Sequence, residues 1–138
     1  QTAKAIAQQV AATEAALAKR DSAAARSMAK RLTAAREAFL QVVDFVAAQV
    51  KSDPNAVFAG SVPYLMLAGN LVAGWQMARA LLAAEEQLAD GTGDADFLRA
   101  KVVTARFYAE HLLSQAPATR DAIVEGAQSV TALAPELF

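Results

Sequence analysis

The feature that most limits how this chain can fold is a long stretch without charge. No charged residue occurs from Val57 to Ala78, and Arg79 is the first charge that follows. The large apolar residues of this stretch point in nearly every direction around a helical wheel, and a helix that is apolar all round is buried in a protein core or in lipid. We therefore expect a central apolar helix at about residues 62–89, with the other helices forming a wall around it.

Pro63 lies close to the expected start of this helix. Proline lacks a backbone N–H and its ring clashes with the preceding helical turn, so it is excluded from a regular helix interior. Ser61 is a candidate cap for a helix that restarts with Pro63 in its first turn. These residues predict a short helix near residues 54–60, a kink near Pro63, and a long helix that stops at Gly91.

The flanking segments carry apolar residues three and four positions apart, which is the spacing of helices with one apolar face. The clearest pattern lies in residues 22–51, and weaker ones lie in residues 2–20, 95–114 and 118–134. The side chains that form these stripes are Ile6, Val10, Thr13 and Leu17; Met28, Leu32, Ala35, Phe39, Val42 and Val46; Leu98, Val102, Ala105, Ala109 and Leu112; and Ile123, Ala127, Val130 and Ala134. We expect the side chain of Trp75 to be largely buried against the stripe of residues 28–46.

Capping residues divide the chain into separate helices. In Lys19-Arg20-Asp21-Ser22 either of the last two residues can cap a second helix, which predicts a tight turn there. One continuous helix over residues 2–51 is the alternative. Asp53 is the expected cap of the next helix, with Pro54 at its first position. No β-alternation occurs, and the pattern predicts an all-α, up-and-down bundle of four to five helices.

Length and composition limit the class of protein. A chain of 138 residues fits a single domain over residues 1–138, and it contains no cysteine for disulfides or thiolate metal sites. The net charge of −1 argues against a nucleic-acid binder that works by bulk charge. No signal-peptide pattern is present, and we expect a cytoplasmic protein. Because the sequence begins with Gln1 rather than Met, we expect a piece of a longer protein.

The uncharged stretch is long enough to cross a bilayer, since about 20 apolar residues suffice. Against this stand its polar residues Ser61, Asn70 and Gln76 and the amphipathic helices on both sides, whose stripes need a partner in the same protein. We therefore expect no membrane insertion.

The sequence offers few candidates for chemistry. His111 is the only histidine and lacks the companions of a metal site or a nucleophile system. Asp94 or Asp96 is better explained as a helix cap than as half of a catalytic pair. No dinucleotide-binding glycine motif, P-loop or zinc-protease motif is present. We assign no catalytic, cofactor-binding or metal-binding residue.

Several residues are candidates for contact with a partner. Phe107, Tyr108 and His111 lie within one and a half helical turns, and an aromatic cluster left outside a bundle marks a docking site. Arg106 precedes Glu110 by one turn, which predicts a helical ion pair. Arg79 also lies in apolar surroundings, and Glu37 or Asp44 is its expected partner. A basic cluster is either a solvated face or a site for phosphate or anionic lipid; its members are Lys19, Arg20, Arg26, Lys30, Arg31 and Arg36.

Two stretches together resemble a known family. The first is Val62-Pro63-Tyr64-Leu65 leading into Ala73-Gly74-Trp75 and Ala78-Arg79-Ala80. The second is Phe97 through Lys101-Val102, followed by Ala105-Arg106-Phe107-Tyr108-Ala109-Glu110-His111-Leu112-Leu113. Both are similar to the C-terminal helical domain of a bacterial branch of the acyl-CoA dehydrogenases, the branch that includes 3-methylmercaptopropionyl-CoA dehydrogenase. The similarity extends from about Ser61 to Leu113.

The resemblance implies a parent flavoenzyme. Such an enzyme uses a glutamate base to take the α proton of an acyl-CoA, passes the β hydride to FAD, and sends electrons to an electron-transfer flavoprotein. The family's catalytic and flavin-binding residues lie upstream of this domain, so none is carried over. The function implied is an accessory domain that braces the catalytic body or the oligomer interface, whose partner is the rest of the parent chain or a second subunit. The alternative is a stand-alone helical adaptor, such as a surface-coating protein of the phasin kind.

Overall fold

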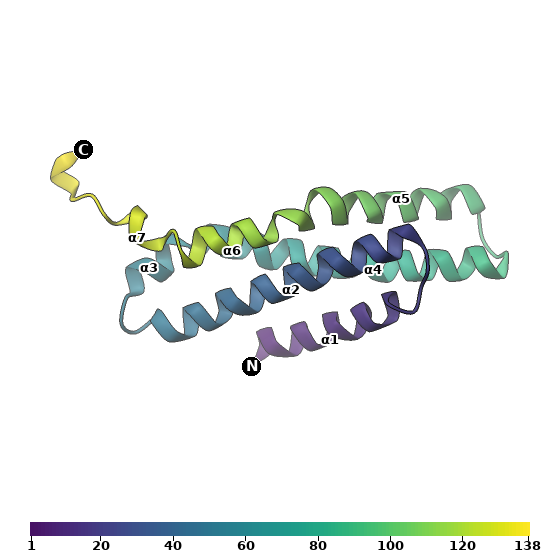
Figure 1. The fold of residues 1–138 in the computed structure, drawn as a ribbon, viewed down its shortest axis with the longest axis horizontal. Helices are drawn as coiled ribbons and strands as arrows, with labels where there is room; N and C mark the ends of the chain where they lie inside the picture. Colours follow the sequence, from purple (N-terminus) through teal and green to yellow (C-terminus); the bar gives the residue numbers. More distant parts are fainter.

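Long helices run back and forth along one axis in the computed structural model, which describes all 138 residues (Figure 1). α1 (Thr2–Leu17) and α2 (Ala23–Gln49) are antiparallel, and the short α3 (Pro54–Ala59) leads into α4 (Ser61–Asp90). The chain returns through α5 (Ala95–His111), a 3-10 turn (Leu113–Gln115) and α6 (Ala116–Val124). A single turn, α7 (Ala127–Val130), and a 3-10 turn (Pro135–Leu137) follow, and this last segment projects beyond the bundle. The predicted all-α, up-and-down bundle is confirmed.

Side-chain caps begin the helices where the sequence indicates. Ser22 caps α2 by accepting a hydrogen bond from the N–H of Ala25, so the first two helices are separate and the alternative of one continuous helix is wrong. Asp53 caps α3 with Pro54 in the first turn. Gly91 ends α4 with a φ of +69°, a left-handed conformation that side-chain-bearing residues rarely adopt.

The predicted break before α4 is confirmed, although its details differ from the prediction. α3 ends at Ala59, and Gly60 is the residue that separates it from α4. Ser61 is the first residue of α4 and not its cap, and no side chain caps this end. Pro63 occupies the first turn, where its missing N–H would have no partner in any case.

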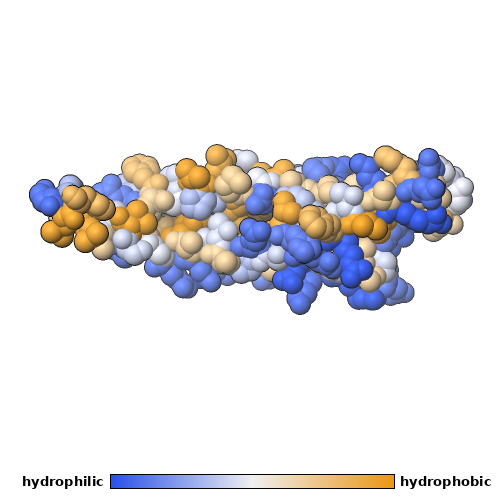
Figure 2. Space-filling model, turned by 90° about the horizontal axis from the view of Figure 1, so that it is seen from above, coloured by the Kyte–Doolittle hydropathy of each residue, from blue (hydrophilic) through white to orange (hydrophobic).

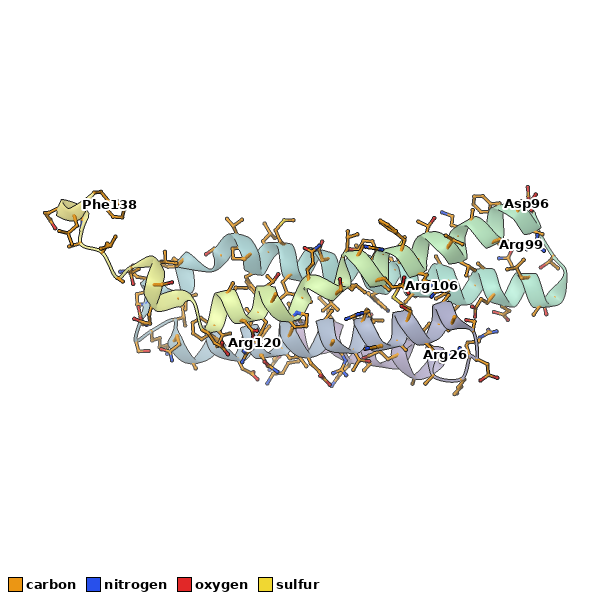
Figure 3. All side chains as sticks on the ribbon, turned by 45° about the horizontal axis from the view of Figure 1, so that its top comes forward. Arg26, Asp96, Arg99, Arg106, Arg120 and Phe138 are labelled. Carbon is orange, nitrogen blue, oxygen red and sulfur yellow. The ribbon has the colours of Figure 1, made fainter.

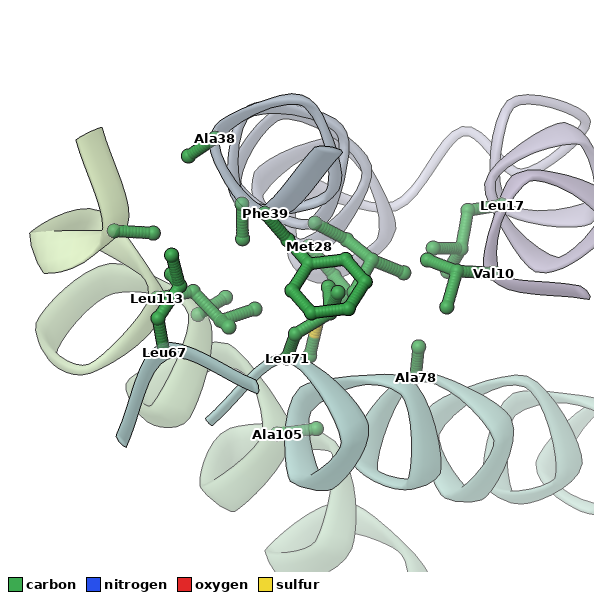
Figure 4. Packing of buried hydrophobic residues seen from close by; sticks show 14 of the residues in the cluster. Val10, Leu17, Met28, Ala38, Phe39, Leu67, Leu71, Ala78, Ala105 and Leu113 are labelled. Atoms are coloured by element: carbon green, nitrogen blue, oxygen red, sulfur yellow. The ribbon is translucent and has the colours of Figure 1, made fainter. Parts of the chain in front are cut away.

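The core lies between α2 and the helices that surround it (Figure 4). α2 contributes more buried side chains than any other helix, and it contacts α1, α4, α5 and α6. Its predicted stripe is buried from Met28 to Val42, with Val46 half-buried at the end. Leu67, Leu71 and Ala78 of α4 meet this stripe from one side.

The other helices do not enclose α4 on all sides, contrary to the sequence-based expectation. One face of it packs on the core, while Val62, Leu65 and Met66 are exposed. Trp75 also differs from the prediction, because it is only half-buried and its indole N–H donates to the Thr13 hydroxyl of α1 over 2.9 Å. The indole group thus bonds to α1 and not to the stripe of α2.

Candidate interaction surface

An exposed apolar face occupies the first half of α4. Val62 and Leu65 expose 73% and 70% of their surface, and Met66 exposes 57%. The exposed positions recur at spacings of three and four, so they share one side of the helix. We call this face the apolar strip; it consists of Val62, Leu65, Met66, Gly69, Val72 and Ala73.

The apolar strip exists because α4 has two apolar faces. The opposite face supplies Leu67, Leu71 and Leu81 to the core, and it is the one that the bundle needs for folding. Seen from above, much of the apolar surface lies toward the end of the bundle that carries α3 and the C-terminal segment (Figure 2). Soluble monomers rarely expose large contiguous apolar patches, and such patches mark sites of interaction.

The structure divides the predicted aromatic cluster of α5. The rings of Phe107 and His111 stack at 4.4 Å between centroids, and both side chains are exposed. Tyr108 instead turns inward, where its hydroxyl donates to the backbone carbonyl of Asn70 over 3.0 Å. Burial raises the pKa of the Tyr108 hydroxyl. This hydrogen bond fixes the register of α5 against α4. Its acceptor, Asn70, directly follows Gly69 of the apolar strip.

The two arginine candidates have different surroundings. Arg106 is an exposed residue of α5 (Figure 3), and its Nε contacts Glu110 Oε1 at 2.8 Å, as predicted. Glu110 also accepts a hydrogen bond from the Ser27 hydroxyl over 2.9 Å. The hydrogen bonds from Arg106 and Ser27 hold the pKa of this carboxyl below its ordinary value.

The predicted pairing of Arg79 with Glu37 or Asp44 is wrong. Its guanidinium lies 5.7 Å from the centroid of the Trp75 ring and donates to the Gln76 side chain over 3.1 Å. Because Arg79 is exposed, water solvates its charge and no carboxylate is required.

The basic cluster does not form an enclosed binding site for phosphate or anionic lipid. Arg36 pairs with Glu14, and Arg26 donates to the backbone carbonyl of Asp21. No carboxylate of the chain lies within ion-pair distance of the remaining members, which are Lys19, Arg20, Lys30 and Arg31. Their distribution is that of a solvated surface.

The chain holds no group of three or more histidine and acidic side chains that could bind a metal ion. Its hollows are open grooves, and the largest, of about 640 Å³, lies between α1 and α2. Four alanines and four polar residues line this groove, including Lys30 and Arg36 of the basic cluster, and it is open to solvent. Asp94 caps α5 by accepting hydrogen bonds from the N–H groups of Asp96 and Phe97, as predicted.

None of the helices has both the length and the apolar character needed to cross a bilayer. The surface that remains as the main functional candidate is the apolar strip, and the exposed, stacked Phe107 and His111 of α5 are a second one.

The fold and this surface define a class of protein: an all-helical bundle with one apolar face left open. Residues 3–134 match the sequence family described as "Acetyl-CoA dehydrogenase C-terminal like", and the chain belongs to this family. It is 45% identical over 129 residues to 3-methylmercaptopropionyl-CoA dehydrogenase of Ruegeria pomeroyi. That match covers 94% of this chain but only 22% of the relative, and the family predicted from the sequence is confirmed.

Proposed function

We propose that this chain is the accessory C-terminal domain of a flavin-dependent acyl-CoA dehydrogenase, that it braces the catalytic body or the oligomer interface, and that it is not itself catalytic. The observation that carries the proposal is the apolar strip, an uncharged helix face that the bundle leaves uncovered. Membership of the family supports it, as does the small share of the relative's length that the chain spans. Four exposed residues are further candidates for contact with the partner in this proposal: the stacked Phe107 and His111, and Arg79 and Arg106.

The acidic residues of this chain are poorly suited to flavin or acyl-CoA chemistry. A bound pyrophosphate needs backbone donors at a helix N-terminus or glycine-rich turn. The glycine-rich turn here is Gly91-Thr92-Gly93, and Asp90, Asp94 and Asp96 around it would repel phosphate. Abstraction of an α proton needs a carboxylate in a dry pocket, whereas Glu110 lies at the surface and is held by Arg106 and Ser27. FAD, the acyl-CoA and the electron-transfer flavoprotein belong in this proposal to the parent enzyme, which we place in the cytoplasm.

The adaptor hypothesis has less support. An adaptor of this kind would use the alanine-rich helices of residues 2–51 to present an apolar face to a coated surface. These helices, α1 and α2, instead direct their stripes into the core, and the exposed apolar face lies on α4. Family membership favours the enzyme domain over the adaptor.

The test is to express the complete gene that encodes this chain and to compare its product with the 138-residue chain alone. We expect the complete product to show flavin absorbance and to reduce an electron acceptor when an acyl-CoA is added, and the 138-residue chain to do neither. Tight FAD binding or turnover by the 138-residue chain would contradict the accessory role. A complete product without flavin would contradict the enzyme assignment.

A further inference from the structure

Gly69 is a glycine that the packing of this chain does not explain. It lies inside α4, where glycine is less favourable than alanine. A Cβ placed on Gly60 would come within 2.9 Å of Ile123, and one on Gly74 within 2.8 Å of Leu113, so close packing accounts for both of those glycines. A Cβ placed on Gly69 would meet nothing within 4 Å.

Apolar residues flank Gly69 on both sides along the exposed face of α4. Leu65 and Met66 lie one turn before it on the same face of α4, and Val72 and Ala73 lie one turn after it. Leu65, Met66 and Val72 are exposed large side chains, so Gly69 is a gap between two pairs of apolar residues. Small residues flanked in this way let a second helix approach closely, and a large side chain of that helix can fill the gap.

We infer that Gly69 is the point of closest approach for a helix of the parent enzyme's catalytic body, which packs across the apolar strip and seats a large apolar side chain over the glycine. The inference rests on the proposed function and names the partner of that surface. No charge interrupts α4 before Arg79, which suits an apolar protein helix and not phosphate-bearing lipid or nucleic acid. The matched region covers only 22% of the relative, so the body of such an enzyme is large and its covalent connection gives it a high local concentration.

The three methionines of the chain provide the measurement. Met66 is exposed on the apolar strip, Met77 is half-buried, and Met28 is fully buried in the core. Oxidation by dilute hydrogen peroxide, followed by mass spectrometry, reports the exposure of each sulfur atom. We expect Met66 to oxidise about tenfold more slowly in the complete parent protein than in the 138-residue chain. Met28 should remain slow in both and serves as the internal control for folding.

Two variants of Gly69 separate docking from folding. In the 138-residue chain, Gly69→Ala and Gly69→Leu should both raise the melting temperature, because each is a better helix former with open space around it. In the parent, Gly69→Leu should fill the gap, displace the partner helix and restore fast oxidation of Met66. Ala83→Leu, an exposed position in the second half of α4, is the matched control and should leave Met66 protected.

Equal oxidation of Met66 in the parent and in the 138-residue chain would overturn the inference. Protection of Met66 that rises with concentration in the 138-residue chain, together with a dimer in sedimentation, would overturn it in favour of a second copy. A parent without flavin or acyl-CoA oxidation would overturn the proposed function, and protection of Met66 is measured independently of that result.

Discussion

Arg36 of α2 contacts Glu14 of α1 across 2.6 Å, from Nε to Oε2, and this is the only ion pair in the chain that joins two helices. Glu14 is the one charged residue that is buried, and its second carboxylate oxygen accepts no hydrogen bond from the chain. The pair therefore holds α1 on the bundle. Without Arg36, the buried carboxylate of Glu14 would lower the stability of the folded chain.

Replacing Arg36 by methionine should lower the free energy of unfolding by about 2–3 kcal/mol, because the Glu14 carboxylate would remain buried without its partner. Urea unfolding followed by circular dichroism measures this change. The double variant Glu14→Leu with Arg36→Met should recover most of the loss, since it leaves no unpaired charge. A double variant that is less stable than Arg36→Met alone would contradict this explanation.

The hydrogen bond from Trp75 to Thr13 should be a second tie between α1 and the bundle. Thr13→Val should lower the free energy of unfolding by about 0.5–1.5 kcal/mol, the usual contribution of one hydrogen bond. The same substitution in a Trp75→Phe background should have a much smaller effect, because the indole donor is already gone and only the long hydrogen bond from the Thr13 hydroxyl to the Gln9 carbonyl, over 3.4 Å, is still lost. Thr33→Val on α2 is the control, since the Thr33 hydroxyl makes no hydrogen bond in the structure. Equal effects of Thr13→Val in both backgrounds would show that the bond contributes nothing.

The parts of this fold that follow from local chemistry were predictable. The stripe from Met28 to Val42 is buried because helical periodicity alone places those residues on one face. Ser22, Asp53 and Asp94 cap their helices because a side-chain oxygen at that position satisfies nearby N–H groups whatever the rest of the chain does.

The candidate surface was only partly predictable, for two physical reasons. An apolar residue such as Leu65 gives the same sequence signal whether it packs inside its own bundle or against another protein, so the sequence alone predicts that the apolar strip is buried. The orientation of Tyr108 depends on its hydrogen bond to Asn70, and that bond requires the register between α4 and α5. This register cannot be inferred from the positions of Phe107, Tyr108 and His111 along one helix, because it depends on how α5 packs against α4.

Gly74 should respond to substitution in the opposite sense to Gly69, although both lie in α4. A Cβ at Gly74 would stand 2.8 Å from two methyl carbons of the buried Leu113 side chain, so Gly74→Ala should destabilise the chain by about 1–3 kcal/mol through overpacking. Gly69→Ala, with open space around it, should stabilise the chain by about 0.5–1 kcal/mol. Thermal unfolding of both variants measures the difference. The combination Gly74→Ala with Leu113→Ala should remove the clash and leave only the cost of the smaller core side chain.

The last prediction concerns the carboxyl group of Glu110, whose pKa lies below its ordinary value of 4.5 because of hydrogen bonds from Arg106 and then from Ser27. A carboxyl with a lowered pKa in the folded state stabilises that state at pH values above 4.5. The contribution is lost as the pH falls from 4.5 through the folded value, because the unfolded chain takes up the proton first. Wild type should therefore melt at a higher temperature than Glu110→Gln by a constant margin above about pH 5.5, and the margin should shrink below pH 4.5.

Melting temperatures of both proteins between pH 7 and pH 3 provide the measurement for Glu110. Glu136→Gln, in the exposed C-terminal turn, is the matched control and should follow wild type throughout, because no hydrogen bond or ion pair holds that carboxyl. Added salt should narrow the Glu110 margin at neutral pH, since Arg106 is exposed and its charge is screened. A margin that stays the same from pH 7 to pH 3 would mean that the bonds from Arg106 and Ser27 do not distinguish the ionised carboxylate from its neutral form.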